Sequence, residues 1–325
     1  MHGGELDGRN RWYLVNNAML DIKRILCPVD FSDASRHAID QAVVIAKWYA
    51  ARITALHVYD PIFAPASGLA TVGYPVEPPF EAVDSKRLED EATTWCRSAI
   101  PPGIELEILI ETGQPAKHIL QRAVSLPADL VVMGTHGVGG FQHLVLGSVT
   151  EKVLRTARCP VLTVPPRGQA TSRLPFKRMV CAVDLSDSSL TGLRSALSLA
   201  QEADAELTIL HVLEWPWEEP PPPELKGLPP EQAFNLAEFR RYREHQATAQ
   251  LKTLVPDSTL EWCTPTTRLR HGKPYVEILR VAEEQSADLI VMGVRGRTTV
   301  DVTVFGSTTN QVVRRATCPV LTIHG

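Results

Sequence analysis

The sequence lacks both a strong net charge and long apolar runs. Its formal net charge is −4, with 22% charged residues, so no overall basic field attracts nucleic acid or an anionic membrane. No apolar run approaches the length of a membrane span. Residues 1–17 also lack the basic and apolar regions of a secretory signal. We therefore expect a cytoplasmic protein that binds neither nucleic acid nor membrane.

Motifs for metal binding and for phosphoryl chemistry are also missing. The chain has six cysteines, but none stands in a C-x-x-C or Cys/His spacing that holds a metal. Four of them flank apolar, strand-like runs, which is typical of buried thiols. There is no Walker lysine motif, no kinase catalytic loop, no Ser-Gly-Gly-x-Asp-Ser loop and no clear general base. We therefore predict no metal ligands, no catalytic residues and no efficient enzyme.

The chain does carry one glycine pattern twice. Gly134-Thr-His-Gly137, nine residues and Gly147-Ser148 recur as Gly293-Val-Arg-Gly296, nine residues and Gly306-Ser307. An apolar run precedes each pattern, and a helix-like segment follows it. Glycine lets the backbone approach a ligand closely, and a helix start presents N–H groups to an anion. The sequence therefore predicts two phosphate-binding loops.

The repeat covers two whole domains. Cys159-Pro-Val-Leu-Thr recurs as Cys318-Pro-Val-Leu-Thr, and Val29-Asp30 recurs as Val183-Asp184. Each copy has roughly 145 residues, which is long enough to bury its own core. The predicted boundaries are an N-terminal extension at 1–20, a first domain at 21–166, a linker at 167–176 and a second domain at 177–325.

Strands and helices alternate in the first copy, and the second repeats their order. We predict strands at 23–29, 53–58, 106–110, 130–133 and 161–164, and helices at 33–50, 81–99, from Pro115, and at 148–157. Ser32 is an expected N-cap, and proline is favoured at a first helical position such as 115. This alternation indicates an α/β fold with a doubly wound parallel sheet.

Together these motifs resemble the universal stress proteins. The resemblance is carried by Val29-Asp-Phe-Ser-Asp33, by the Leu-His-Val strand ends, by the two glycine loops and by the Cys-Pro-Val-Leu segments, and it covers residues 21–323. It implies two Rossmann-like domains of the adenine nucleotide alpha hydrolase type, each with five parallel strands in the order 3-2-1-4-5. It also implies that the last strands, 161–164 and 320–323, join the copies into an internal pseudo-dimer. A homodimer of the chain is a further assembly that it allows.

The resemblance also implies that the chain binds ATP, with Mg²⁺ or Mn²⁺. The implied binding residues lie at the strand ends and in the glycine loops, beyond the carboxyl ends of the strands, where α/β sheets bind ligands. In the first copy they are Pro28, Asp30, Val58, Met133, Gly134, His136, Gly137, Gly147, Ser148, Val149 and Thr150. In the second copy they are Asp184, Val212, Met292, Gly293, Arg295, Gly296, Gly306, Ser307, Thr308 and Thr309.

The two sites depart from each other in sequence. Ala182 stands where the first copy has Pro28, and Arg295 stands where it has His136. The second copy also has Arg297 after its second loop glycine, where the first has Val138. We expect the second site to neutralise phosphate charge better. His136 has two interpretations, as an exposed polar loop residue or as a pH-sensitive or ion-linked group.

Three functions remain open at this point. The first is a regulatory stress-response module in which ATP shifts a conformation or an oligomer. The second is a slow ATPase or phosphotransferase. The third is a nucleotide-free scaffold that binds an unidentified protein partner through its edges and through the proline-rich segment 215–223.

Overall fold

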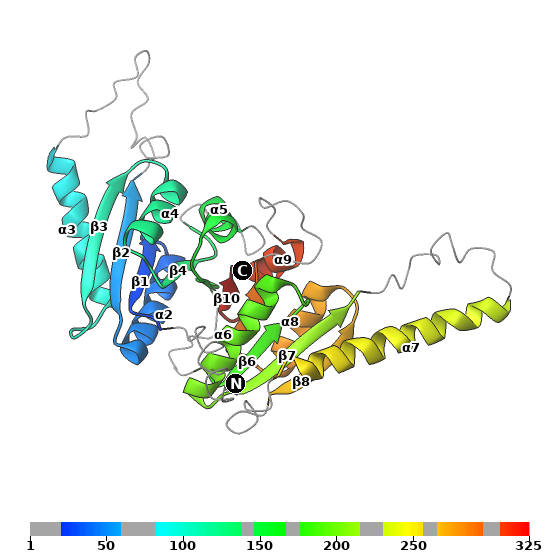
Figure 1. Ribbon diagram of the computed structural model, residues 1–325. Helices are drawn as coiled ribbons and strands as arrows, with labels where there is room; N and C mark the ends of the chain where they lie inside the picture. Colours follow the sequence, from blue (N-terminus) through cyan, green and yellow to red (C-terminus); the bar gives the residue numbers. More distant parts are fainter. Residues whose placement is uncertain are drawn as a thin grey trace, which may run out of the picture. The chain divides into compact units, whose positions relative to one another are not determined.

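A computed structural model (Figure 1) describes residues 21–59, 82–137, 146–166, 176–214, 230–255, 265–294 and 306–324. Four predicted segments therefore lie wholly or mostly outside the described residues. They are the N-terminal extension, the linker, the proline-rich segment 215–223 and the part of the second glycine loop that contains Arg295, Gly296 and Arg297.

The described elements alternate as the sequence predicts. The first copy contains β1 (Arg24–Val29), α2 (Asp33–Tyr49), β2 (Arg52–Tyr59), α3 (Ala82–Ala99), β3 (Leu106–Thr112), α4 (Pro115–Ser125), β4 (Leu130–Gly134), α5 (Ser148–Thr156) and β5 (Val161–Val164). The second contains β6 (Arg178–Ala182), α6 (Asp187–Ala203), β7 (Glu206–Leu213), α7 (Pro230–Thr253), β8 (Thr266–His271), α8 (Pro274–Glu284), β9 (Leu289–Gly293), α9 (Ser307–Arg315) and β10 (Val320–Ile323).

Local signals set the helix that follows the first strand of each copy. The Ser32 hydroxyl accepts a hydrogen bond from the Ser35 N–H at 3.2 Å, and the Ser186 hydroxyl accepts one from the Ser189 N–H at 3.3 Å. Both serines are therefore N-caps, as expected for Ser32. Pro115 and Pro274 begin α4 and α8, where proline lacks only an N–H that a helix start leaves unpaired.

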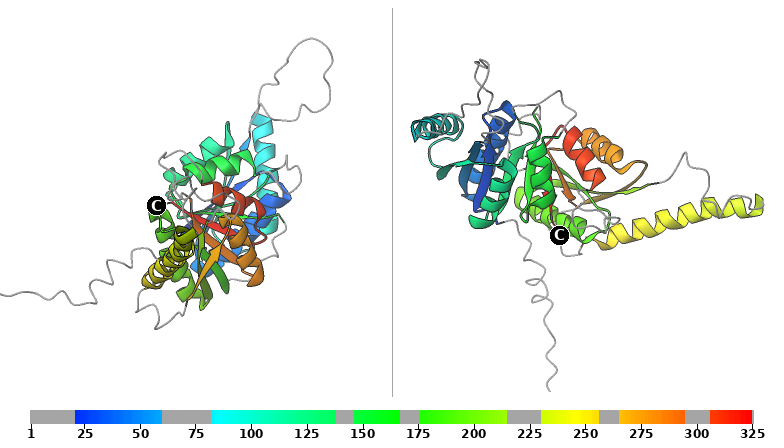
Figure 2. Two further views of the ribbon diagram at one scale, coloured as in Figure 1. Left: turned by 90° about the vertical axis from the view of Figure 1, so that its right-hand side faces the viewer. Right: turned by 90° about the horizontal axis from the view of Figure 1, so that it is seen from above.

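The strands follow the order β3-β2-β1-β4-β5 in the first copy and β8-β7-β6-β9-β10 in the second, which confirms the predicted topology. In the first copy, α2 packs against α3 on one face of the sheet, and α4 packs against α5 on the other (Figures 1 and 2). Every residue of β4 is buried. The right-hand view of Figure 2 also shows α7 as one long helix, which contacts β7 and β8.

The last strand of the chain packs with the first copy. Residues 313–322 form one compact unit with residues 21–174, and β10 pairs there with β5 in antiparallel direction, as expected for these two strands. The Thr163 hydroxyl donates to the Val320 carbonyl at 3.2 Å, and the Thr322 hydroxyl donates to the Val161 carbonyl at 3.0 Å. Both threonines are fully buried and out of reach of water. These two bonds therefore supply the hydrogen-bond partners that their hydroxyl groups need.

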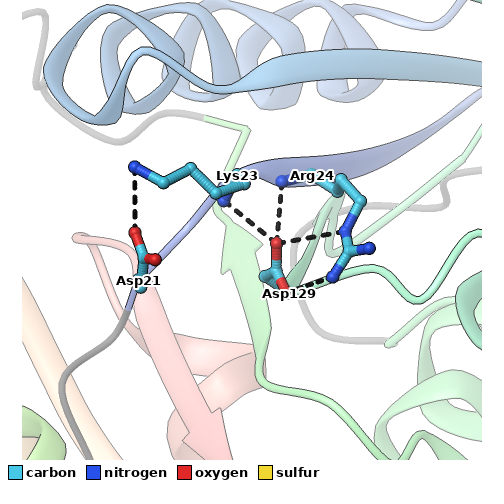
Figure 3. Close-up of polar contacts among 4 residues, drawn as sticks. All are labelled: Asp21, Lys23, Arg24 and Asp129. Atoms are coloured by element: carbon cyan, nitrogen blue, oxygen red, sulfur yellow. Dashed lines mark hydrogen bonds and ion pairs between the residues drawn. The ribbon is translucent and has the colours of Figure 1, made fainter.

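One carboxylate ties the start of β1 to β4 (Figure 3). Asp129 Oδ2 accepts hydrogen bonds from the backbone N–H groups of Lys23 at 3.0 Å and Arg24 at 2.9 Å, and Oδ1 lies 3.1 Å from Arg24 Nη2. Burial raises the pKa of the Asp129 carboxyl, but these hydrogen bonds outweigh it and hold that pKa below its ordinary value. The equivalent Asp288 accepts backbone bonds from Lys177 and Arg178, yet burial leaves its pKa raised.

The two carboxylates are therefore expected to respond in opposite directions to neutralisation. Asp129→Asn should lower the free energy of unfolding by about 1–2 kcal/mol at pH 7. That loss should vanish as the pH falls through the depressed pKa of Asp129, because the parent carboxyl is then protonated. The raised pKa of Asp288 means that burial disfavours its ionised form in the folded protein, so Asp288→Asn should raise the free energy of unfolding at pH 7. Urea unfolding between pH 3 and 7 measures both, and equal losses at pH 7 would contradict this assignment.

Candidate functional site

A cavity of about 710 Å³ opens at the carboxyl ends of β1, β2 and β4, within the size range of small-molecule sites. All eleven residues that the sequence singled out in the first copy line it. Among the described residues, six more line it: Val29, Ser35, Leu56, Pro115, Ile119 and Leu146. The structure thus brings the strand ends and both ends of the glycine loop together around one space.

Asp30 follows β1 and is fixed by the start of α2. Its Oδ1 accepts hydrogen bonds from the Ser32 N–H at 3.1 Å, from the Ser32 hydroxyl at 2.5 Å and from the Ser35 hydroxyl. Its Oδ2 lies toward the glycine loop, because a Cβ built on Gly137 would stand 2.5 Å from it. A larger residue at position 137 would therefore require the Asp30 carboxylate to move from its present position.

The far end of the glycine loop is tied to β4. The Gly147 N–H donates to the Thr135 carbonyl, and the Thr150 hydroxyl donates to the Gly134 carbonyl, both at 2.9 Å. These bonds fix the N-terminus of α5 at the cavity. The N–H groups of its first turn have no partner inside the helix, and the helix dipole adds partial positive charge there. This end of the cavity is therefore suited to a phosphate group.

The first glycine of the pattern has a packing role. A Cβ on Gly134 would stand 2.9 Å from the Ala34 Cβ and 3.0 Å from the Ala34 backbone, on the α2 side of the sheet. In the second copy, a Cβ on Gly293 would stand 2.6 Å from Ser188 Oγ and 2.7 Å from the Ser189 nitrogen. These two glycines let the helix after the first strand lie directly against β4 or β9.

Sequence reasoning missed the six additional lining residues, although strand spacing pointed to Leu56. Leu56 precedes Val58 by two residues on β2, so both side chains face the same side of the sheet, and it is the register partner of Pro28. Pro115 and Ile119 lie one turn apart on α4 and therefore share a face. Helix contacts of this kind appear only once the crossover helix is placed over its sheet.

An ion-pair cluster holds α4 in place over the cavity. Glu111 on β3, the register partner of Val58, contacts His118 Nδ1 through Oε2 at 2.5 Å and Arg122 through Oε1. Burial raises the pKa of Glu111. The hydrogen bonds from His118 and Arg122 lower it by more than burial raises it, so the pKa lies below its ordinary value. Glu111 is therefore a carboxylate at neutral pH, and it fixes the helix that carries Pro115 and Ile119.

The copies differ at the centre of the sheet. In the second copy, β6 pairs with β9 through four registered pairs, from Met179↔Leu289 to Ala182↔Met292. In the first, β1 pairs with β4 only through Ile25↔Leu130 and Leu26↔Val131. Proline has no N–H to donate, so Pro28 ends the ladder early. This gap lies beside the cavity, which Pro28 also lines.

The second copy repeats most of the remaining geometry. Asp184 Oδ1 accepts from the Ser186 N–H at 3.0 Å and from the Ser186 hydroxyl at 2.5 Å. The Thr309 hydroxyl donates to the Gly293 carbonyl at 3.0 Å, and the Gly306 N–H donates to the Val294 carbonyl at 3.2 Å.

The remaining predicted residues of the second copy occupy equivalent positions where they are described. Val212 and Met292 lie on β7 and β9, and Ser307 and Thr308 begin α9. Arg295 and Gly296 lie outside the described residues. In the first copy, His136 is half-buried, lines the cavity, and its Nδ1 lies 2.8 Å from the Thr135 hydroxyl. His136 is therefore partly exposed, and its two interpretations remain predictions.

Comparisons with known proteins cover both copies. The sequence model of the Universal stress protein family matches residues 21–165 and 175–324. The universal stress protein MJ0531 of Methanocaldococcus jannaschii is 35% identical over 162 residues, which is 47% of this chain and 91% of that protein. Universal stress protein E of Photorhabdus laumondii is 23% identical over 325 residues, 94% of this chain and 96% of that one.

A solved structure shows the same fold over most of the chain. The crystal structure of a universal stress protein from Archaeoglobus fulgidus matches with a TM-score of 0.62 and 23% identity, over 93% of this chain and 98% of that one. Within the part of this chain that the structure describes, no helix combines the length and apolar character needed to cross a membrane.

Proposed function

The chain belongs to the universal stress protein family, and we propose that it is a regulatory module that binds ATP in each copy. The observation that carries this proposal is the cavity at the strand ends of the first copy. It joins an anion-binding helix terminus, a fixed carboxylate and an apolar wall in one space. These are the three parts that a nucleotide requires for its phosphates, its sugar and its base.

Each part of the nucleotide has a matching part of the site. The phosphates would lie at the N-terminus of α5, against Gly147 and Ser148, where N–H groups and the helix dipole favour negative charge. Asp30, held by Ser32 and Ser35, would accept hydroxyl or amino hydrogens of the nucleoside. The base would lie between the apolar side chains of the cavity, which are Pro28, Leu56, Val58, Ile119 and Met133. Mg²⁺ or Mn²⁺ would enter with the phosphates.

The proposal favours regulation over catalysis because, among the described residues, the one carboxylate that lines the cavity is already held in place. This carboxylate, Asp30, accepts three hydrogen bonds from the start of α2, which leaves His136 as the described lining side chain through which the enzyme alternative would act. Slow ATP hydrolysis or phosphotransfer is the alternative, and a nucleotide-free scaffold is the third. We further propose a cytoplasmic location, which agrees with described cysteines that form no disulfides, and an internal pseudo-dimer built on the β5–β10 pairing.

Nucleotide extraction tests the proposal most directly. Freshly purified full-length protein should release adenine nucleotide on denaturation, and the emptied protein should bind ATP with Mg²⁺ or Mn²⁺ in a calorimetric titration. GTP titrated in parallel is the control for base recognition. If ATP at micromolar concentration binds to neither copy, the proposal is wrong. A steady-state phosphate-release assay separates the enzyme alternative, which requires repeated turnover.

A further inference from the structure

The residue that follows Asp30 has an unusual backbone. Phe31 has φ +63°, and the equivalent Leu185 after Asp184 has φ +66°. Large side chains are disfavoured in this left-handed region, and such residues persist only where their surroundings hold them. Both copies therefore hold the turn after their aspartate in a strained conformation.

In the first copy, the ring of Phe31 lies between two other rings. It stacks on His57 with ring centroids 4.4 Å apart and an interplanar angle of 32°, and it meets Trp95 edge-on at 5.5 Å and 78°. His57 is itself fixed, because its Nδ1 lies 2.9 Å from the Val29 carbonyl. Edge-to-face and offset ring pairs are attractive beyond the area that they bury. We call Phe31, His57 and Trp95 the aromatic cluster.

The aromatic cluster connects the turn to α3. Trp95 lies on α3, and the Arg36 guanidinium of α2 stands 6.0 Å from the centroid of its ring. Arg36 also donates to the Ser98 hydroxyl at 2.8 Å and to the Ser98 carbonyl at 3.0 Å. The Trp95 ring therefore contacts both Arg36 of α2 and Phe31 of the turn after β1.

We propose that Phe31 is a positioning residue for the first nucleotide site, and that Trp95 makes this site depend on α3. The Phe31 ring contacts Trp95 of α3, which lies with α2 on one face of the sheet. The preceding residue, Asp30, lines the cavity. The φ of Phe31 sets where the backbone places Asp30 and Ser32. With the ring held, Asp30 keeps its Oδ2 toward Gly137. The inference rests on the proposed ATP binding.

The second copy forms this turn with an aliphatic side chain. His211 keeps the contact of its Nδ1 with the Val183 carbonyl at 2.7 Å, but Leu185 has no ring to stack on it. The second site therefore serves as an internal reference. Loss of the aromatic cluster should weaken ATP binding at the first site and leave the second unchanged.

The test uses the full chain with one site silenced at a time. In a Gly306→Leu background, only the first site reports ATP binding by calorimetry. Trp95→Ala and Phe31→Gly should each weaken that binding by about five-fold, since an aromatic pair contributes a free energy of this size. Phe31→Gly removes the ring while its backbone accepts the positive φ without strain, and a thermal unfolding scan verifies that the variant is folded. Trp95→Phe keeps a ring and should restore binding. Trp48→Ala, at a 44% exposed tryptophan on α2, is the matched control and should change nothing.

The outcomes separate the two proposals. If the Gly306→Leu parent binds ATP and both Trp95→Ala and Phe31→Gly bind equally well, the positioning role is wrong while the nucleotide site stands. If the parent does not bind ATP, the proposed function fails, and the positioning role fails with it. Weaker binding that Trp95→Phe does not restore also contradicts the role of the ring. In a Gly147→Leu background, the second site should be insensitive to Trp95→Ala, and any loss there contradicts the inference.

Discussion

Gly147→Leu should abolish ATP binding at the first site while leaving the protein folded. A Cβ at position 147 would stand 3.4 Å from the Thr135 carbonyl and 3.6 Å from Thr150 Oγ1, which are ordinary contacts, so the backbone accepts a side chain. Position 147 lines the cavity at the start of α5. The remaining leucine atoms would compete with the phosphates for the space before the helix N–H groups. We expect the Kd for ATP at this site to rise by a factor on the order of 100 or more.

A graded pair of substitutions checks this explanation. Gly147→Ala adds only the Cβ that the structure accommodates, so it should retain most of the affinity. Gly306→Leu should silence the second site and spare the first. Calorimetric titration of each variant gives affinity and stoichiometry, and a thermal unfolding scan verifies that the fold is retained. Full-strength binding by Gly147→Leu would show that the nucleotide does not use the α5 terminus.

Gly293→Ala should instead reduce stability strongly. The added Cβ would stand 2.7 Å from the Ser189 nitrogen and 2.8 Å from the Ser188 carbonyl carbon, and these backbone atoms cannot rotate away. Either α6 must move off β9 or the strand must bend. Overpacking of this kind costs about 1–3 kcal/mol, and we expect a loss near the upper end because the contacts are with backbone. Denaturant unfolding measures the loss, with Gly134→Ala as its first-copy equivalent.

Gly192→Ala is the matched control in the same helix and sheet. Its Cβ would meet the Met292 carbonyl carbon at 3.6 Å, which is an ordinary contact, and alanine favours the helical state over glycine by up to about 1 kcal/mol. This variant should therefore be as stable as the parent or more stable. If Gly293→Ala proved equally harmless, the close approach of α6 to β9 would not be the reason for glycine at 293.

Much of the fold could be predicted from the sequence because its signals are local. The caps at Ser32 and Ser186, the prolines that begin α4 and α8 and the apolar runs of the strands each act within a few residues. The duplication supplied an independent check on every element. The order of strands followed from the family resemblance rather than from these local signals.

The role of individual site residues was less predictable. Gly134 and Gly147 look alike in the sequence and both line the cavity, yet only Gly134 packs tightly against α2, a difference that the distances to Ala34 and Thr135 reveal. The contribution of α4 was missed because Pro115 and Ile119 meet the cavity through the placement of a whole helix. The contacts of Phe31 with Trp95 join residues far apart in sequence and leave no local pattern.

The placement of β10 has a consequence for the order of events during synthesis. The first copy emerges from the ribosome long before residues 313–322, yet those residues complete its compact unit through the β5–β10 pairing. Until then β5 presents an unpaired strand edge, of the kind that recruits other chains. The nascent first copy therefore completes its compact unit only after most of the second copy has been made, and its safe folding depends on how quickly residues 313–322 follow.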